Sequence, residues 1–252
     1  MHVTNTVRLS NILAILIAIA LSLADASAQT GIKTSLWKWT QPASHHNSVV
    51  KVETKSGSGS GVLVHIFNTR PIANGYEGLC LTAEHVVGDN VDGKIKVTYR
   101  NGKRARNCKV ISTNEALDVA VLWVWVPNGI APAPIANADV TMGQKLEFCG
   151  LGGDSSLNLM RHFTSFAESP TSEKQIFASA PLLPGDSGGP VFNNAGQLVG
   201  IISGGWFWFD GGVKSPNGKS ISVTWPARAC HLAGLSDLLV EAIADKLDLA
   251  KR

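Results

Sequence analysis

The sequence predicts an all-β fold that ends in one α-helix. From residue 48 onward, about a dozen short runs rich in Val, Ile, Leu and Phe alternate with turn residues, a pattern typical of short strands. Asn-Gly pairs at 101–102 and 217–218 favour tight hairpins. No segment of helical periodicity separates the runs, which favours a barrel or sandwich over a parallel α/β sheet. Only residues 235–247 change to a helical period, so we expect a helix that starts near Ser236.

The composition excludes several classes of protein. The chain has 252 residues, of which 44% are hydrophobic and 16% are charged, so it is too apolar and too weakly charged to be disordered. Its net charge of +3 offers no polybasic surface for nucleic acid or for anionic membranes. We therefore expect a globular protein that binds no nucleic acid, and neither a coiled coil nor a multispan membrane protein.

The first 28 residues are predicted to be a secretory signal peptide. Residues 12–21 form an unbroken apolar run, which as a helix would span roughly 15 Å, about half of a bilayer core. The small residues Ala26 and Ala28 then supply the pattern that signal peptidase cleaves. Cleavage after Ala28 would export the mature chain to the periplasm or the cell exterior, without stable membrane insertion. A buried N-terminal helix and an uncleaved anchor are the alternatives.

The mature chain is expected to contain an irregular segment and two halves. Residues 29–47 are polar and show no strand pattern. A stretch rich in proline, glycine and alanine at 126–138 links the halves, and we place the boundary near residue 135. Residues 48–135 then form the first half, and residues 136–252 form the second half together with the C-terminal helix.

The four cysteines, Cys80, Cys108, Cys149 and Cys230, leave two interpretations open. An exported chain can form disulfides, and four cysteines allow three full pairings between which the sequence does not choose. Cys80 and Cys149 lie in strongly apolar runs, so buried free thiols are the alternative. The chain has no Cys-x-x-Cys pair and no histidines with ligand spacing, so neither a metal nor another cofactor is expected.

The segment 184–190, Pro-Gly-Asp-Ser-Gly-Gly-Pro, has the features of a catalytic loop. Its glycines let the backbone turn sharply and let the amides of Gly185 and Ser187 point into one space, as an oxyanion hole requires. A serine hydroxyl needs a neighbouring base, and His85 is available at the end of an apolar strand. Asp118 begins a nearly all-apolar strand, where a carboxylate requires a hydrogen-bonded partner such as an imidazole.

These motifs, in the order His, Asp, Ser, resemble the chymotrypsin/trypsin-like serine peptidases, especially the compact domains of secreted bacterial and HtrA-type peptidases. Residues 58–64 (SGSGVLV) are similar to the opening of the family's first barrel, and residues 198–205 (LVGIISGG) to the strand that lines the substrate cleft. The resemblance implies two six-stranded antiparallel β-barrels, a site between them and a C-terminal helix. No PDZ-like domain follows in the sequence, so a regulated HtrA assembly is not implied.

The resemblance also implies a role for each site residue. Ser187 would be the nucleophile, His85 the general base and acid, and Asp118 the residue that orients His85. Gly185 and Ser187 would supply the oxyanion-hole amides, and Ser203 would help to satisfy the Asp118 carboxylate. The expected activity is that of a secreted serine endopeptidase, which hydrolyses peptide bonds of a polypeptide substrate through an acyl-enzyme intermediate.

The substrate would lie along the strand that contains Ser203, Gly204 and Gly205, because these residues would pair with its backbone. In relatives, the residue six positions before the nucleophile forms the floor of the specificity pocket. Here that residue is Pro181, followed by Leu182. Since neither side chain carries a charge, we expect a preference for an apolar residue before the scissile bond.

Two alternatives remain open from the sequence. A peptidase-like scaffold that only binds a partner is one. The other is an α/β-hydrolase-type esterase, because residues 185–189 also match a Gly-x-Ser-x-Gly elbow and Asp210 and His231 follow in the required order. The sequence leaves the oligomeric state open, and it does not show how Asp186 is paired, since the expected mature terminus differs from that of activated trypsin relatives.

Overall fold

In the computed structural model, Trp39–Arg252 form one compact unit. The structure describes residues 38–40, 43–72, 74–88, 94–152, 160–167, 175–178, 181–214, 220–232 and 235–249. The predicted signal peptide at 1–28 lies outside these residues.

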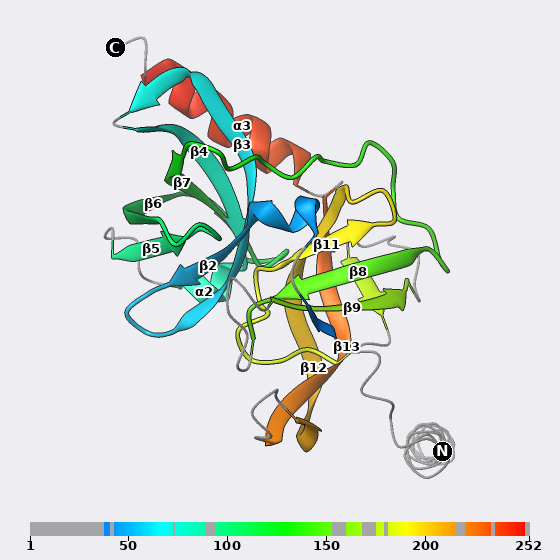
Figure 1. Cartoon of the computed structure of the whole chain (residues 1–252). Coiled ribbons are helices and arrows are strands. Elements are labelled where there is room, and N and C mark those ends of the chain that lie inside the picture. Colours follow the sequence, from blue (N-terminus) through cyan, green and yellow to red (C-terminus); the bar gives the residue numbers. More distant parts are fainter. Residues whose placement is uncertain are drawn as a thin grey trace, which may run out of the picture. The chain divides into compact units, whose positions relative to one another are not determined.

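The first half of the unit is a closed antiparallel barrel of six strands (Figure 1). Its strands are β2 (Val49–Glu53), β3 (Ser58–Ile72), β4 (Gly75–Thr82), β5 (Ile95–Thr98), β6 (Arg104–Asn114) and β7 (Val119–Pro127). Around the barrel they follow the order β2-β3-β4-β7-β6-β5. Because the barrel is closed, none of these six strands is left with a free edge.

The second half is a seven-stranded antiparallel sheet with the order β1-β9-β8-β11-β12-β13-β10. Its strands are β1 (Lys38–Thr40), β8 (Lys145–Gly150), β9 (Met160–Phe166), β10 (Gln175–Ala178), β11 (Pro190–Asn193), β12 (Leu198–Lys214) and β13 (Ser220–His231). One isolated bridge, between Ala167 and Ala178, joins the end of β9 to β10, so the six strands β8 to β13 curl toward a second barrel. The predicted all-β, two-barrel fold is thus confirmed.

The second half differs from the expected six strands because β1 adds a seventh. This strand, and the 3-10 helix η2 (Ser44–Ser48) except for its last residue, lie in the segment 29–47, which we expected to be irregular. An edge strand pairs through its backbone and needs no alternation of side chains. A polar segment without a strand pattern can therefore still extend a sheet.

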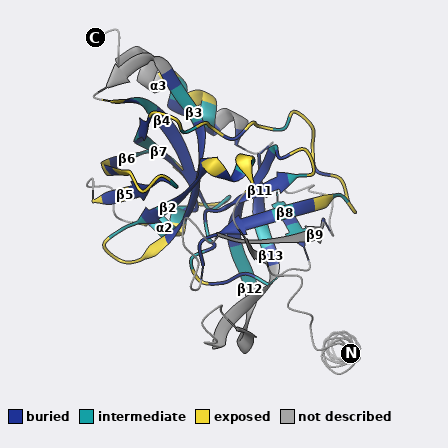
Figure 2. Cartoon of the chain, viewed as in Figure 1, coloured by how far each residue is buried: buried dark blue, intermediate teal, exposed yellow. Residues whose placement is uncertain are grey.

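The longest apolar runs belong to strands that are buried on both faces. In β4, Leu79 and Leu81 lie in one core cluster, whereas Cys80 between them lies in the cluster that fills the first barrel. In β7, Val121 and Leu122 divide between the same two clusters. Strands covered on both sides need no polar face, so they are continuously hydrophobic. Figure 2 shows β4 and β7 as mainly buried, whereas several residues of β6 are exposed.

The C-terminal helix α3 (Ser236–Leu249) forms where the sequence predicts it. Although it follows the second half in the chain, Leu238 and Ala242 join a core cluster that includes Val64 and Leu79 of the first barrel. Figure 1 shows α3 alongside β3 and β4. The apolar face of the helix therefore covers the outside of the first barrel, so the chain crosses back at its end.

All four cysteines are free thiols and all are buried. Burial raises the pKa of Cys108 to about 12, and it also raises the pKa of Cys80. Of the two interpretations that the sequence left open, the structure thus has buried thiols. Among the described residues, no helix combines the length and the apolar character that a membrane crossing requires.

Candidate active site

His85 lies on the one-turn helix α2 (Glu84–Val87), immediately after strand β4. The end of β4 is anchored, because the hydroxyl of its last residue, Thr82, donates a 2.7 Å hydrogen bond to the carbonyl of Ser60 on β3. The His85 side chain is 51% exposed. A buried strand end thus presents an accessible imidazole at the rim of the first barrel.

Asp118 occupies a tight turn just before β7. Its φ of 55° is in the left-handed region, which aspartate tolerates better than most residues. The turn is held by two hydrogen bonds, from the Asp118 amide to the Glu115 carbonyl at 3.1 Å and from the Leu117 amide to Asn114 Oδ1 at 3.0 Å. The turn fixes the direction of the Asp118 carboxylate before the strand begins.

The carboxylate of Asp118 accepts hydrogen bonds from two neighbours. His85 Nδ1 lies 2.9 Å from Oδ2 and 3.0 Å from Oδ1, and the His85 amide donates to Oδ1 at 3.0 Å. Ser203 Oγ on β12 donates to Oδ2 at 2.5 Å. An ionised carboxylate only accepts, so Nδ1 of His85 carries the proton and Nε2 keeps a free lone pair. The imidazole is therefore held in the tautomer that can act as a base.

The pKa values of the pair move apart, as expected for an ion pair. The pKa of His85 is raised, first by its hydrogen bond to Asp118, against the opposing effect of burial. Burial alone would raise the pKa of Asp118, but hydrogen bonds from His85 and Ser203 outweigh burial and lower it. Both shifts favour the charged forms, so protonated His85 is stabilised next to ionised Asp118.

Along the loop around Ser187, amides that donate a hydrogen bond alternate with amides that have no acceptor. The amide of Asp186 donates to the Leu183 carbonyl at 3.0 Å, and the amide of Gly188 donates to the Ile202 carbonyl at 2.7 Å. Among the described residues, neither the Gly185 amide nor the Ser187 amide has a hydrogen-bond acceptor. Gly185 has a φ of 96°, which glycine adopts without strain. The loop can therefore direct two unoccupied N–H groups at one ligand oxygen.

Asp186 is the internal anchor of this loop. Its side chain is completely buried, and it accepts hydrogen bonds from the Leu183 amide at 2.8 Å and from the Gly152 amide at 3.0 Å. Hydrogen bonds from backbone amides can compensate the burial of a carboxylate. The partners of Asp186, which the sequence left open, thus include two main-chain amides of the second half.

Ser60 of β3 connects the two halves at the Ser187 loop. Its amide donates to the Ser187 carbonyl at 2.8 Å, and its hydroxyl donates to the Gly185 carbonyl at 2.7 Å. The same hydroxyl accepts from the Leu151 amide at 2.9 Å. A Cβ atom at Gly188 would overlap the Ser60 carbonyl, so only glycine fits this contact. The family resemblance of residues 58–64 did not by itself indicate a role for Ser60.

The loop of Ser187 and the helix of His85 meet at Gly59. A Cβ atom built on Gly59 would lie 2.6 Å from Val86, the neighbour of His85, and 2.8 Å from the Ser187 carbonyl oxygen. The Ser187 hydroxyl donates a long hydrogen bond of 3.4 Å to the Ser203 carbonyl. Among the described residues it makes no hydrogen bond to His85. The structure thus joins His85, Asp118 and Ser203 directly, and brings Ser187 to the same place through its backbone.

The residues expected to bind substrate have different exposures. Leu182 is buried, with only 2% of its surface exposed, and Pro181 is half-buried. Gly204 and Gly205 on β12 are half-buried, and a Cβ atom at Gly204 would meet no atom within 4 Å. The strand after Ser203 therefore has open space beside Gly204.

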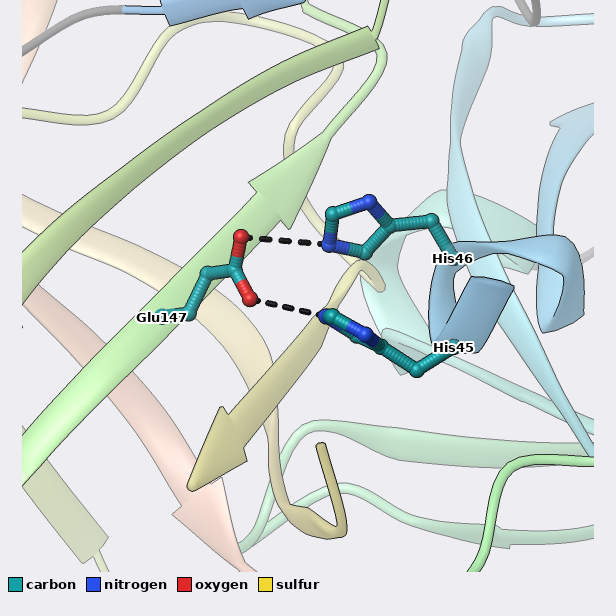
Figure 3. A group of neighbouring side chains, drawn as sticks. All are labelled: His45, His46 and Glu147. Carbon is teal, nitrogen blue, oxygen red and sulfur yellow. Dashed lines mark hydrogen bonds and ion pairs between the residues drawn. The ribbon is translucent and has the colours of Figure 1, made fainter. Parts of the chain in front are cut away.

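His45 and His46 of η2 and Glu147 of β8 form a second polar group (Figure 3). Their donor atoms lie within 4.8 Å of one another, and Glu147 lies 2.9 Å from His45 Nε2 and 3.1 Å from His46 Nε2. No sequence pattern indicated this group, because Glu147 is about a hundred residues away from the histidines.

The protonation of His46 argues against a metal ion between these residues. Nδ1 of His46 accepts a 2.9 Å hydrogen bond from the Ala43 amide, so Nδ1 carries no proton and Nε2 must carry it in the neutral ring. A protonated Nε2 cannot donate a lone pair to a metal. The group instead fastens η2 to the second half through hydrogen bonds to Glu147.

The segment after Ser187 excludes one alternative from the sequence. An α/β-hydrolase elbow requires a helix directly after the serine and a parallel sheet. Here β11 (Pro190–Asn193) follows, within an antiparallel sheet. His231, the base required by that alternative, is only 3% exposed, and its Nε2 accepts a hydrogen bond from the Val140 amide at 3.1 Å. The alternative of an α/β-hydrolase-type esterase is therefore wrong for this chain.

Two antiparallel halves that meet at a His–Asp pair and a glycine-rich serine loop define the chymotrypsin-like class of fold. The chain belongs to the trypsin-like peptidase domain family, whose profile matches residues 59–201. It is 29% identical over 199 residues to "Protease Do-like 1, chloroplastic" from Arabidopsis thaliana, covering 75% of this chain and 40% of that protein. It is also 26% identical over 176 residues to "Periplasmic pH-dependent serine endoprotease DegQ" from Escherichia coli, covering 66% of this chain and 34% of that protein.

A solved structure supports the fold at lower sequence identity. The serine endoprotease from Yersinia pestis superposes with a TM-score of 0.58 at 20% identity, covering 81% of this chain and 68% of that chain. The curated relatives named above are much longer than the matched region, so this chain spans only 40% and 34% of their lengths.

Proposed function

We propose that this protein is an exported serine endopeptidase that hydrolyses peptide bonds with Ser187, His85 and Asp118. The observation that carries the proposal is the hydrogen-bonded set of His85, Asp118 and Ser203 beside a loop with two unoccupied amides. Membership in the trypsin-like peptidase domain family supports the same reaction class.

The reaction follows from the tautomer of His85. Nε2 takes the proton of Ser187 Oγ as the oxygen attacks the scissile carbonyl carbon, and Asp118 stabilises the imidazolium that forms. His85 then gives this proton to the amine, the C–N bond breaks, and an acyl-enzyme remains. Water hydrolyses the ester by the same route. For this step the Ser187 hydroxyl must rotate away from the Ser203 carbonyl and toward His85 Nε2. The hydrogen bond between a nucleophile and its base is often long or absent before substrate binds.

The amides of Gly185 and Ser187 stabilise the oxyanion. They have no other acceptor among the described residues, so they need not break a bond before they bind the developing charge. The burial of Asp186 and the contact with Ser60 hold the loop that carries them. This preorganisation is what gives such donors their effect on the transition state.

The substrate is a polypeptide that extends along Ser203, Gly204 and Gly205 as an added antiparallel strand. Open space at Gly204 supports this placement, because a Cβ atom there would meet no atom within 4 Å among the described residues. Pro181 and Leu182 give the pocket no charge, so we propose a broad preference for apolar residues before the scissile bond. An additional methylene in such a pocket changes binding by only about 1 kcal/mol.

Export and domain organisation complete the proposal. The apolar run at 12–21 and the small residues before position 29 support a signal peptide at 1–28 and a location in the periplasm or outside the cell. The periplasmic designation of one relative supports this location. We place the boundary between the halves near residue 135, within the segment between β7 and β8.

The proposal is tested with a fluorophosphonate probe, which labels an activated serine with loss of fluoride. The purified mature protein should be labelled at Ser187, and Ser187→Ala should abolish both labelling and peptide cleavage. Ser112→Ala, at a serine on β6, is the matched control and should label like the parent. If the folded parent protein is not labelled, the chain is a binding module; if Ser187→Ala still cleaves peptides, the nucleophile lies elsewhere.

A further inference from the structure

Arg228 lies beside the set of His85, Asp118 and Ser203, although no sequence motif singled it out. It belongs to β13, where it is paired with Gly204 of β12. Its Nη2 atom donates a 2.8 Å hydrogen bond to Ser203 Oγ. The pairing of Arg228 with Gly204 places the guanidinium next to Ser203, the residue before Gly204 on the neighbouring strand.

The contact with Arg228 determines which way the Ser203 hydroxyl points. A guanidinium has only donors, so Ser203 Oγ must be the acceptor in this bond. Its single proton is therefore available for Asp118 Oδ2, which is 2.5 Å away and can only accept. The direction of every hydrogen bond from Arg228 through Ser203 to Asp118 follows from the chemistry of these groups alone.

Arg228 also brings a positive charge near His85. Among the described residues, the charged groups that act on His85 are Asp118, Glu84 and Arg228. The two carboxylates raise the pKa of His85, chiefly through the hydrogen bond that His85 donates to Asp118, whereas Arg228 lowers it. The arginine thus opposes the tendency of the carboxylates to keep His85 protonated, and protonated His85 is not a base.

The position of Arg228 carries an energetic cost. Its Nε atom is buried and has no hydrogen-bond partner among the described residues. The side chain lines a small cavity of about 80 Å³ together with Glu115, Asp118, Gln175 and Ser203. Buried unsatisfied donors are rare in native proteins. Among the described residues, the contact with Ser203 is the one hydrogen bond of this side chain.

We propose that Arg228 is a positioning residue of the site, which holds the Ser203 hydroxyl proton on Asp118 and so fixes the carboxylate that orients His85. This role rests on the proposed peptidase function, because it concerns the same His85. It also adds a second effect through space, since the cation keeps more His85 in its neutral, basic form at a given pH. Arg228 does not touch the reacting atoms; it acts through Ser203 and Asp118.

The two effects are separated by three variants and one control. Arg228→Met removes both the hydrogen bond and the charge, and Arg228→Lys keeps the charge. Ser203→Ala removes the acceptor through which Arg228 acts on Asp118. Arg104→Met removes an exposed arginine from β6 of the first barrel, so it controls for the loss of one positive charge.

We expect Arg228→Met to lower kcat/KM about tenfold, the size of losing one charge-assisted hydrogen bond, and to move the acidic limb of the pH profile to higher pH. Arg228→Lys should keep the limb in place. The double variant with Ser203→Ala should lose no more kcat/KM on the pH-independent plateau than Ser203→Ala alone, but its acidic limb should still move to higher pH. Arg104→Met should match the parent. Additive losses in the double variant would overturn the positioning role.

The titration of His85 provides a readout that needs no catalysis. Ring resonances of His85, followed by NMR in a Ser187→Ala background, should titrate at a higher pH with Arg228→Met than without it. Arg228→Gln gives the same test of charge should the Met variant not fold. An unchanged titration would refute the through-space effect of Arg228 on His85 even in an active peptidase. Failure of the proposed function shows separately, as an unlabelled Ser187 in the parent protein.

Discussion

The two halves hold their parts of the site by different means. In the first barrel, His85 and Asp118 are fixed by hydrogen bonds of their side chains, and these side chains are 51% and 16% exposed. In the second half, the Ser187 loop is fixed by its backbone and by Asp186, which is completely buried. Substitutions of the site side chains in the first barrel should therefore lower activity without affecting folding, whereas changes in the Ser187 loop should lower both activity and stability.

The difference follows from what each part must provide. An imidazole that moves protons has to be reached by substrate, so it cannot be enclosed in the core. Amides that stabilise an oxyanion must keep their direction without rearranging, so the loop that carries them is fixed by buried hydrogen bonds. Ser60 is the point at which the two arrangements meet, because it bonds both to the loop and to Thr82 next to α2.

The largest expected effect is on turnover alone. His85→Ala should reduce kcat by a factor of about 10⁶, because Ser187 loses its base, and the loss should not add to that of Ser187→Ala. The melting temperature should stay within a few degrees of the parent value, since a half-exposed side chain contributes little to the core. Peptide cleavage and thermal unfolding of the same preparations measure both quantities. A large drop in melting temperature would show that the first-barrel part is not separable from the fold.

A change in the loop should instead lower stability and activity together. Gly188→Ala places a Cβ atom against the Ser60 carbonyl and the Thr82 hydroxyl, at a φ of 83° that favours glycine. We expect it to destabilise the fold by about 3 kcal/mol, from overpacking and backbone strain combined. Denaturant unfolding measures this free energy. Gly102→Ala is the matched control, since Gly102 has a similar φ of 78° but open space around it, and it should retain full activity.

The smallest expected effect concerns pH. The pKa of His85 is raised, first by its hydrogen bond to Asp118, so kcat/KM should rise with pH through a pKa above 6.5. The same shift stabilises the fold below pH 6.5, and this contribution is lost as pH rises through the raised pKa. Activity and the His85 contribution to stability should thus move in opposite directions. Asp118→Asn should move the acidic limb of the kcat/KM profile to lower pH, because the pKa of His85 is no longer raised by the carboxylate. A limb that stays in place would contradict the ion pair.

Much of the fold was predictable from local patterns. Short apolar runs between turn residues indicated the strands, and the change of period after residue 235 located α3. The sequence also identified the pair of His85 and Asp118 and placed Ser203 beside Asp118, and the structure brings these three side chains together. Their catalytic roles stay predictions. Strand β1 was missed because pairing at a sheet edge leaves no pattern of side chains.

The sequence by itself determined the local conformations: where strands and turns form, that the loop around Ser187 can adopt positive φ, and that α3 has one apolar face. Only the tertiary structure decided which distant groups meet. Ser60 reaches the Gly185 carbonyl across 125 positions, and Arg228 reaches Ser203 from the neighbouring strand. Local conformation depends on residues a few positions apart, whereas these contacts depend on strand register and on the packing of the two halves, which no short segment encodes.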